Sequence, residues 1–130
     1  MATVEERFAS APYCYLLTAG RRSGKPHEIE IWFVAQENTL YLLNGAGKRP
    51  AGMSDWIHNL RGDPMCRVRV SGVVFNAIAR FPVPDGPEDR AMRTALFSKY
   101  AASEWGDLTG WRDTGILVAL DLTGERRASA

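Results

Sequence analysis

The most regular feature of the chain is an alternation of apolar and polar side chains that predicts β-strands. Within residues 27–34, Ile29 and Ile31 fall on one face of an extended chain, whereas Glu28 and Glu30 fall on the other. This pattern is typical of a strand with one buried face. The same criterion predicts six strands, at residues 13–19, 27–34, 39–44, 66–71, 73–81 and 116–122.

The short connections between the first strands predict how they pair. Residues 20–25 contain two glycines and form a turn, and residues 36–38 form a second short connection. We therefore expect the first three strands to form an antiparallel meander.

Two segments have the apolar spacing of helices. Ser54 is the expected N-cap of a short helix over residues 55–62, and Asp85 is a candidate cap for a longer helix over residues 85–102. A further short turn or helix is expected within residues 1–10. The segment 103–113, rich in Gly and Trp, is expected to be a loop, and residues 123–130 a loose tail.

These elements predict a mainly β fold of the α+β class. Six antiparallel strands with two or three helices favour a small β-barrel or a strongly rolled sheet, and 130 residues are most simply one domain.

The composition limits the kinds of partner that the chain can have. Its formal net charge of +1 argues against binding nucleic acid through overall charge, so an anionic partner requires a local patch of cations. No apolar run approaches the ~20 residues needed to span a membrane. Cys14 and Cys66 stand apart within apolar stretches, which favours reduced core thiols and a cytoplasmic protein.

Side chains typical of enzyme active sites form no recognised motif here. His27 and His58 lie far apart, so we expect no metal centre, and we identify no catalytic side chain. What remains is a group of cations and a hydroxyl on a glycine turn, which suits a phosphate or several carboxylates. A solvated hairpin turn is the alternative interpretation. The residues are Arg21, Arg22, Ser23, Lys25 and His27, with Lys48 and Arg49 opening a second glycine-rich segment.

Four tryptophans raise the possibility of an aromatic binding site. Trp32 and Trp56 could supply a flat wall for an aromatic ligand, and Trp105 and Trp111 could wall a second pocket. The alternative is that these rings pack in the core.

Two linked motifs resemble a known family. They are T-x-G-R-x-S-G-x-P at residues 18–26 and W-x-x-N-L-x-x-x-P at residues 56–64, with strands between them. Together they resemble the deazaflavin-dependent nitroreductase family, which are split β-barrel oxidoreductases that use coenzyme F420. This family is related more distantly to FMN-binding proteins of the pyridoxamine-phosphate-oxidase type.

The resemblance implies a six-stranded antiparallel split barrel that forms homodimers, with the cofactor cleft at the subunit interface. It implies that reduced F420 passes a hydride to a small electron-poor acceptor such as a quinone, an enone or a nitroaromatic, with water or Tyr100 as candidate proton donors. The basic loop would hold the phosphate and oligoglutamate tail of F420. By position, the cofactor groove contains Arg21, Arg22, Ser23, Gly24, Lys25 and His27; Asn44, Gly45, Gly47 and Lys48 belong to the loop beside it, and Trp56 and Asn59 to the flanking helix.

Other functions remain open at the level of sequence. Family members often carry Lys in the segment 44–47 and Arg near the position of His27, so FMN is the alternative cofactor. A carrier that binds F420 or FMN without turnover is a second alternative. An RNA-binding barrel is a third, but Glu28 and Glu30 beside the cations disfavour it.

Overall fold

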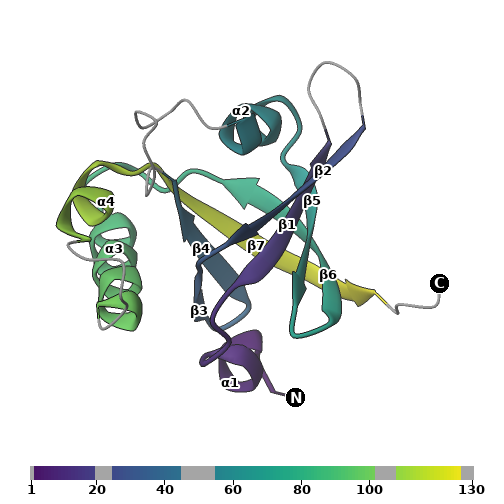
Figure 1. The fold of residues 1–130 in the computed structure, drawn as a ribbon, viewed down its shortest axis with the longest axis horizontal. Coiled ribbons are helices and arrows are strands. Elements are labelled where there is room, and N and C mark those ends of the chain that lie inside the picture. The colour runs from purple at the N-terminus through teal and green to yellow at the C-terminus, as the bar shows by residue number, and fades with distance from the viewer. Residues whose placement is uncertain (1, 20–24, 45–54, 102–107, 127–130) are drawn as a thin grey trace.

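A computed structural model of the chain describes residues 2–19, 25–44, 55–101 and 108–126 (Figure 1). These residues form one curled antiparallel sheet of seven strands with four helices around it. The elements in chain order are α1 (Val4–Phe8), β1 (Cys14–Ala19), β2 (Pro26–Ile31), β3 (Val34–Gln36), β4 (Thr39–Leu43), α2 (Asp55–Gly62), β5 (Met65–Val70), β6 (Val73–Arg80), α3 (Pro87–Tyr100), α4 (Thr109–Thr114) and β7 (Leu117–Arg126).

The strand order explains why the sheet curls. Across the sheet the strands follow the order β2-β1-β5-β6-β7-β4-β3, and every neighbouring pair is antiparallel. The two edge strands, β2 and β3, are consecutive in the chain and are separated only by Trp32 and Phe33. Because two residues span only a few ångströms, the opposite edges of the sheet must approach each other, which gives a half-barrel.

Both hairpins of the expected meander are present, but they do not lie side by side in one continuous meander. β1 and β2 do pair, with Thr18 opposite His27, but β4 pairs with β3 and β7 and not with β2. The expected single strand over residues 27–34 is two strands. Its break is explained by Phe33, whose backbone N–H and C=O both bond the Tyr100 hydroxyl of α3 at 3.0 Å and not a neighbouring strand.

Three further boundaries differ from the expectations. Residues 109–114 form α4 where a loop was expected, and β7 continues to Arg126, into the segment expected to be a tail. α3 begins at Pro87 with Gly86 as its N-cap, because Asp85 has a left-handed backbone (φ 62°) and its N–H bonds Asp89. The described residues thus hold seven strands and four helices, where six and two or three were expected.

Other expectations are confirmed. α2 covers residues 55–62 as predicted, and α1 lies within residues 1–10, closed by a reciprocal capping box between Thr3 and Glu6. Cys14 and Cys66 are buried free thiols, and burial raises the pKa of each to about 12.

No helix in the described ranges is long and apolar enough to cross a membrane.

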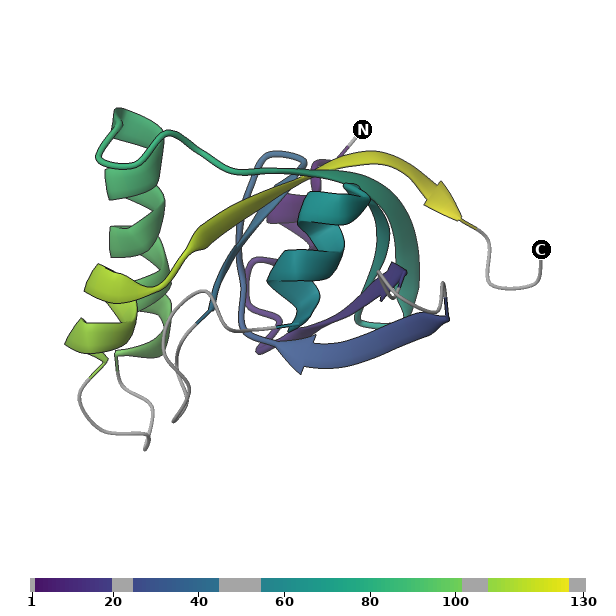
Figure 2. The same cartoon turned by 90° about the horizontal axis from the view of Figure 1, so that it is seen from above.

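Two hydrophobic clusters hold these layers together. The larger one fills the inside of the curl and includes Ile57 and Leu60 of α2 with strand residues such as Leu42. The smaller one lies between the outer face of β4 and β7 and the pair α3–α4, and includes Leu96 and Trp111. The helices α3 and α4 thus cover one side of the half-barrel, and α2 covers one end of its curl (Figures 1 and 2).

Candidate functional site

The β1–β2 hairpin positions the two described members of the cationic group. Ala19 pairs with Pro26 at the end of the ladder, and Lys25 and His27 are exposed where β2 begins. The other predicted residues of this turn, Arg21, Arg22, Ser23 and Gly24, lie outside the described residues.

The two sequence motifs meet at one buried hydrogen bond. The side-chain amide of Asn59 donates to the hydroxyl of Thr18 at 3.1 Å, and both residues are only 3% exposed. Thr18 opens the first motif and Asn59 belongs to the second, so this bond ties α2 to the strand that leads into the basic turn. Losing either polar partner would leave a buried donor or acceptor unsatisfied.

Asn44 joins the end of β4 to the start of β7. Its backbone N–H donates to the Ile116 carbonyl at 3.2 Å, and its side-chain oxygen accepts the Ile116 N–H. Asn44 is 3% exposed, so these bonds set the course of the chain as it leaves the sheet. Gly45, Gly47 and Lys48, predicted to follow it in the cofactor loop, lie outside the described residues.

Trp56 is a core residue. It is 9% exposed and belongs to the cluster inside the curl, which favours the alternative of a packed ring over a flat wall for a ligand. Trp32 is half-buried, and Trp105 lies in a range that the structure does not describe.

An aromatic recess lies where β2 ends. It has a volume of about 200 Å³ and is lined by Glu30, Ile31, Trp32, Leu43 and Trp111. The Trp32 ring stacks on the Tyr100 ring, with centroids 4.2 Å apart and planes 6° apart, while the Trp111 ring stands at 85° to Trp32. Trp111 is fixed by its indole N–H, which donates to the Leu43 carbonyl at 3.1 Å.

The Tyr100 hydroxyl is committed to the backbone. It lies 2.8 Å from the Pro12 carbonyl and 3.0 Å from the Phe33 carbonyl, both acceptors for its proton. Burial raises its pKa to about 12. The group therefore holds the β2–β3 junction in place, and these bonds argue against its use as a proton donor. Beside it, burial lowers the pKa of Lys99 to about 8, and its ammonium donates to the Phe33 carbonyl.

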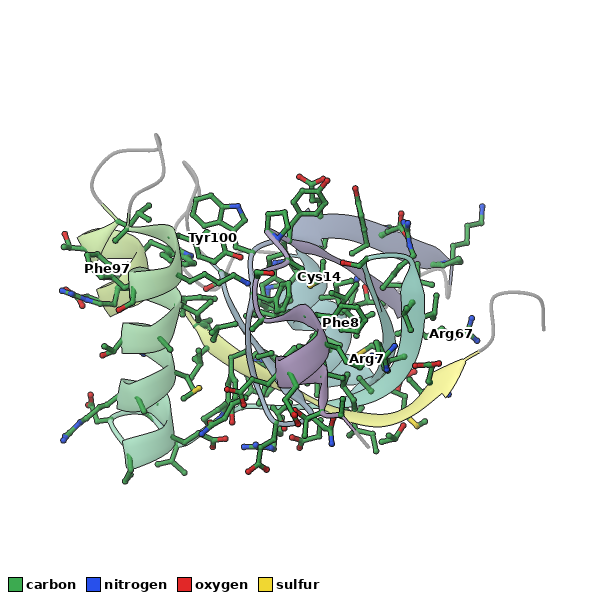
Figure 3. All side chains as sticks on the ribbon, turned by 90° about the horizontal axis from the view of Figure 1, so that it is seen from below. Arg7, Phe8, Cys14, Arg67, Phe97 and Tyr100 are labelled. Carbon is green, nitrogen blue, oxygen red and sulfur yellow. The ribbon has the colours of Figure 1, made fainter. Side chains whose placement is uncertain are left out.

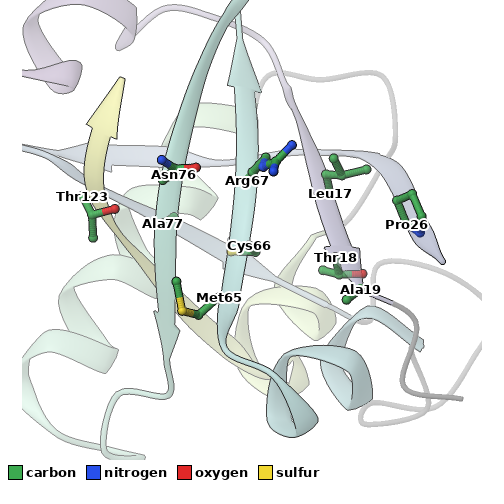
Figure 4. A pocket seen from close by; sticks show the side chains of 10 residues that line it. All are labelled: Leu17, Thr18, Ala19, Pro26, Met65, Cys66, Arg67, Asn76, Ala77 and Thr123. Carbon is green, nitrogen blue, oxygen red and sulfur yellow. The ribbon is translucent and has the colours of Figure 1, made fainter. Parts of the chain in front are cut away.

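A second depression, the outer hollow, lies away from the aromatic recess, along β1, β5 and β6. It has a volume of about 540 Å³, and its lining includes Leu17, Pro26, Met65, Arg67 and Asn76 (Figure 4). Arg67 pairs with Asn76 across β5 and β6, beside a register shift between Asn76 and Ala77. Such bulges are common next to binding sites.

Sequence reasoning did not assign Arg67 or Asn76 to the site. Arg67 alternates with the buried Val68 and Val70 along β5, and Figure 3 shows it on the side of the sheet away from α3. What the alternation could not reveal is the hollow, because it is formed by strands distant in sequence.

The described arrangement suits an elongated, anionic and aromatic ligand. It combines exposed cations at the hairpin, a buried amide between hairpin and α2, and an aromatic recess at the far end of β2. No group of three or more His, Cys, Asp or Glu that could hold a metal ion occurs among the residues described.

Comparisons with known proteins agree with the arrangement. A sequence model of the family described as F420H(2)-dependent quinone reductase matches residues 1–122. The chain is similar to a solved structure described as an F420 reductase, at 18% identity and a TM-score of 0.68, covering 93% of this chain and 94% of that one. It is similar to an F420-H2 dependent reductase, FDR-A, at 19% identity and a TM-score of 0.64, covering 86% and 94%.

A further similar structure is described as a domain-swapped dimer, at 16% identity and a TM-score of 0.63, covering 84% of this chain and 79% of that one. At these identities the structures show a shared fold. A search of curated protein sequences finds no match.

Proposed function

Because this chain belongs to the F420H(2)-dependent quinone reductase family, we propose that it reduces a quinone with F420 held along the β1–β2 hairpin. The chain is an F420H2-dependent oxidoreductase with F420 as its cofactor. What we propose is that its acceptor is a quinone and that its cofactor site lies along the hairpin. The observation that carries it is the buried Asn59–Thr18 bond, which joins the two motifs at the base of the basic turn.

The residues present fit the two ends of F420. Lys25 and His27 are exposed donors where β2 begins, as an anionic tail requires. From His27 to Trp32 an extended chain covers about 17 Å, so a long cofactor can reach from these cations to the region of the aromatic recess. Arg21, Arg22, Ser23, Gly24 and Lys48 are proposed to extend the contact with the tail, and Asn44, Gly45 and Gly47 to flank the ring. Trp56 and Asn59, which are both buried, would hold α2 beside it.

The protein contributes position rather than a reactive side chain in this proposal. When bound, reduced F420 supplies the hydride and the proton that together convert a quinone to a hydroquinone. Asn59 holds α2 in fixed relation to the hairpin, and Asn44 holds the end of β4 against the start of β7. The aromatic recess excludes water from part of the surface.

Fluorescence titration with F420, and separately with FMN, tests the cofactor site. The double variant Lys25→Ala/His27→Ala should bind F420 about tenfold more weakly, because two hydrogen bonds to an anion are lost. Its unfolding free energy should change by less than about 0.5 kcal/mol, because both side chains are exposed.

His58→Ala is the matched control for this titration, because His58 is an exposed histidine on α2 outside the hairpin. Unchanged F420 affinity in the double variant would place the tail elsewhere. Tight FMN binding without F420 binding would contradict the proposal that F420 binds at this site. F420 binding without turnover of any acceptor would favour a carrier.

We also propose that the chain forms a homodimer through the outer face of β1, β5 and β6. Met65 and Ile78 pair across β5 and β6 and are 64% and 43% exposed, and the Arg67–Asn76 pair separates them from half-buried Val74 on the same face. Large apolar side chains exposed together on a sheet face can mark an interaction site. The similar structure described as a domain-swapped dimer supports a second copy as the partner.

The charges on this face are compatible with self-association. Glu28 and Arg69 already pair within the chain at 3.5 Å, whereas Glu30 on the edge strand β2 and Arg67 on β5 can be set against each other by a two-fold axis. A stable interface buries roughly 800 Å² per partner, a small part of the 7832 Å² that the chain exposes. The second copy would close the outer hollow, which begins at Pro26 beside the basic turn.

Sedimentation velocity tests the dimer. Met65→Lys should shift the protein to the monomer at micromolar concentration, because a charge would be buried without a partner. Val83→Lys is the control, since Val83 is 74% exposed but lies beyond β6 in the connection to α3. A wild-type monomer, or dissociation by both variants alike, would contradict the proposed interface.

A further inference from the structure

The aromatic recess has features of an acceptor pocket with a preference for charge. We infer that it binds the quinone and that Glu30 makes it select neutral or cationic acceptors over anionic ones. This inference rests on the proposed quinone reductase function. It goes further by assigning a pocket to the acceptor and by naming the charge class that the pocket accepts.

The size and shape of the recess suit a small planar molecule. Its volume of about 200 Å³ is below the roughly 300–1,000 Å³ of pockets that hold drug-sized ligands, which favours one or two fused rings. Trp32 offers a flat indole to such a ring, and the Tyr100 ring stacked 4.2 Å away supports it on the other side. Electron-poor rings stack well on indole, and here the indole is already held in place.

The recess lies beside the segment proposed to flank the cofactor ring. Leu43 is part of its lining, and the next residue, Asn44, is the one that leaves β4 for that segment. Trp111 seals the recess from the α4 side through its bond to the Leu43 carbonyl. An acceptor here would lie next to the proposed cofactor ring, as hydride transfer requires.

Among the residues that the structure describes, Glu30 is the one charged residue in the lining of this recess. The hydroxyl of Tyr15 donates to its carboxylate at 3.2 Å, which restrains the side chain at the end of β2. Lys99 lies behind Tyr100, against Phe33, and does not line the recess. A carboxylate in the lining of the pocket raises the dissociation constant of a bound anion about fivefold at moderate salt.

A matched pair of variants isolates this effect. Glu30→Gln and Glu28→Gln remove one negative charge each from the same face of β2, but Glu28 pairs with Arg69 and does not line the recess. The probes are 1,4-naphthoquinone and 1,4-naphthoquinone-2-sulfonate. Their dissociation constants are measured by quenching of tryptophan fluorescence, and kcat/KM is measured with reduced F420. Each variant is compared with wild type for the same acceptor, so that differences in intrinsic reactivity cancel.

Glu30→Gln should strengthen binding of the sulfonate and raise its kcat/KM about fivefold, and leave both quantities for the neutral quinone within twofold. Glu28→Gln should leave both acceptors unchanged. Equal effects of the two variants would indicate steering by net charge, and no effect of Glu30→Gln would place the acceptor elsewhere; either result overturns the inference. Quinone binding with this charge preference but without turnover would contradict the proposed function and leave the recess assignment standing.

Discussion

Replacing Gly115 with alanine is expected to destabilise the protein by about 3 kcal/mol or more. Gly115 follows α4, and an added Cβ would overlap the carbonyl oxygen of Asn44 and lie 2.9 Å from that of Trp111. Both obstacles are backbone atoms, which cannot rotate away as the end of a long side chain can. Overpacking of this kind costs 1–3 kcal/mol and sometimes more, and chemical denaturation measures the loss.

The same variant should weaken F420 binding if Asn44 leads into the cofactor site. Relief of the overlap requires β4 and β7 to separate at the bonds between Asn44 and Ile116. The control is Gly110→Ala, in the neighbouring helix, where an added Cβ has no atom within 4 Å. We expect Gly110→Ala to stabilise the protein slightly, because alanine favours a helix. Equal stability of the two variants would show that the contact of Gly115 with β4 is looser than described.

Tyr100→Phe is expected to cost about 2 kcal/mol although the variant keeps the aromatic ring. The hydroxyl accepts the Phe33 N–H and lies within bonding distance of two backbone carbonyls, so its removal leaves buried backbone groups unsatisfied. Thermal or denaturant unfolding measures the loss.

Tyr15→Phe is the control for this measurement. Its hydroxyl bonds the exposed Glu30 at the surface, where water replaces a lost partner, so we expect a change of less than about 0.5 kcal/mol. A loss in Tyr100→Phe no larger than that of Tyr15→Phe would mean that the β2–β3 junction is held by other contacts, such as the Lys99 ammonium bonded to the Phe33 carbonyl.

Local patterns predicted most of the individual elements. The alternation of Arg67 and Arg69 with Val68 and Val70 located β5 correctly, and the stripe of Trp56, Ile57 and Leu60 located α2 to the residue. These predictions succeeded because the periods of strands and helices are properties of the local backbone. α4 was missed because its six residues, with a glycine among them, are too few to show a helical period.

The functional residues also divide into those that the sequence identified and those that only the folded structure brings together. The resemblance assigned Lys25, His27, Asn44 and Asn59 to one cofactor site, which stays a prediction. The hydrogen bond between Asn59 and Thr18 shows that the two motifs meet in the fold. The aromatic recess and the outer hollow were not expected in this form, because each gathers residues from strands and helices far apart in the chain. Trp111 shows the difficulty: its spacing from Trp32 in sequence carries no sign that the two rings touch.

The order of the strands is the feature that no local pattern contained. Residues 27–34 read as one continuous strand because the alternation passes into an apolar run without a turn residue. The chain nevertheless leaves the sheet at Trp32 and Phe33 and re-enters it at the opposite edge. That switch depends on the Tyr100 hydroxyl, 67 residues further on, which takes the backbone bonds that a neighbouring strand would otherwise make. Side-chain periodicity therefore specified the strands and the family motifs. The closure of the half-barrel, and with it the two cavities, followed from hydrogen bonds that only the folded chain brings together.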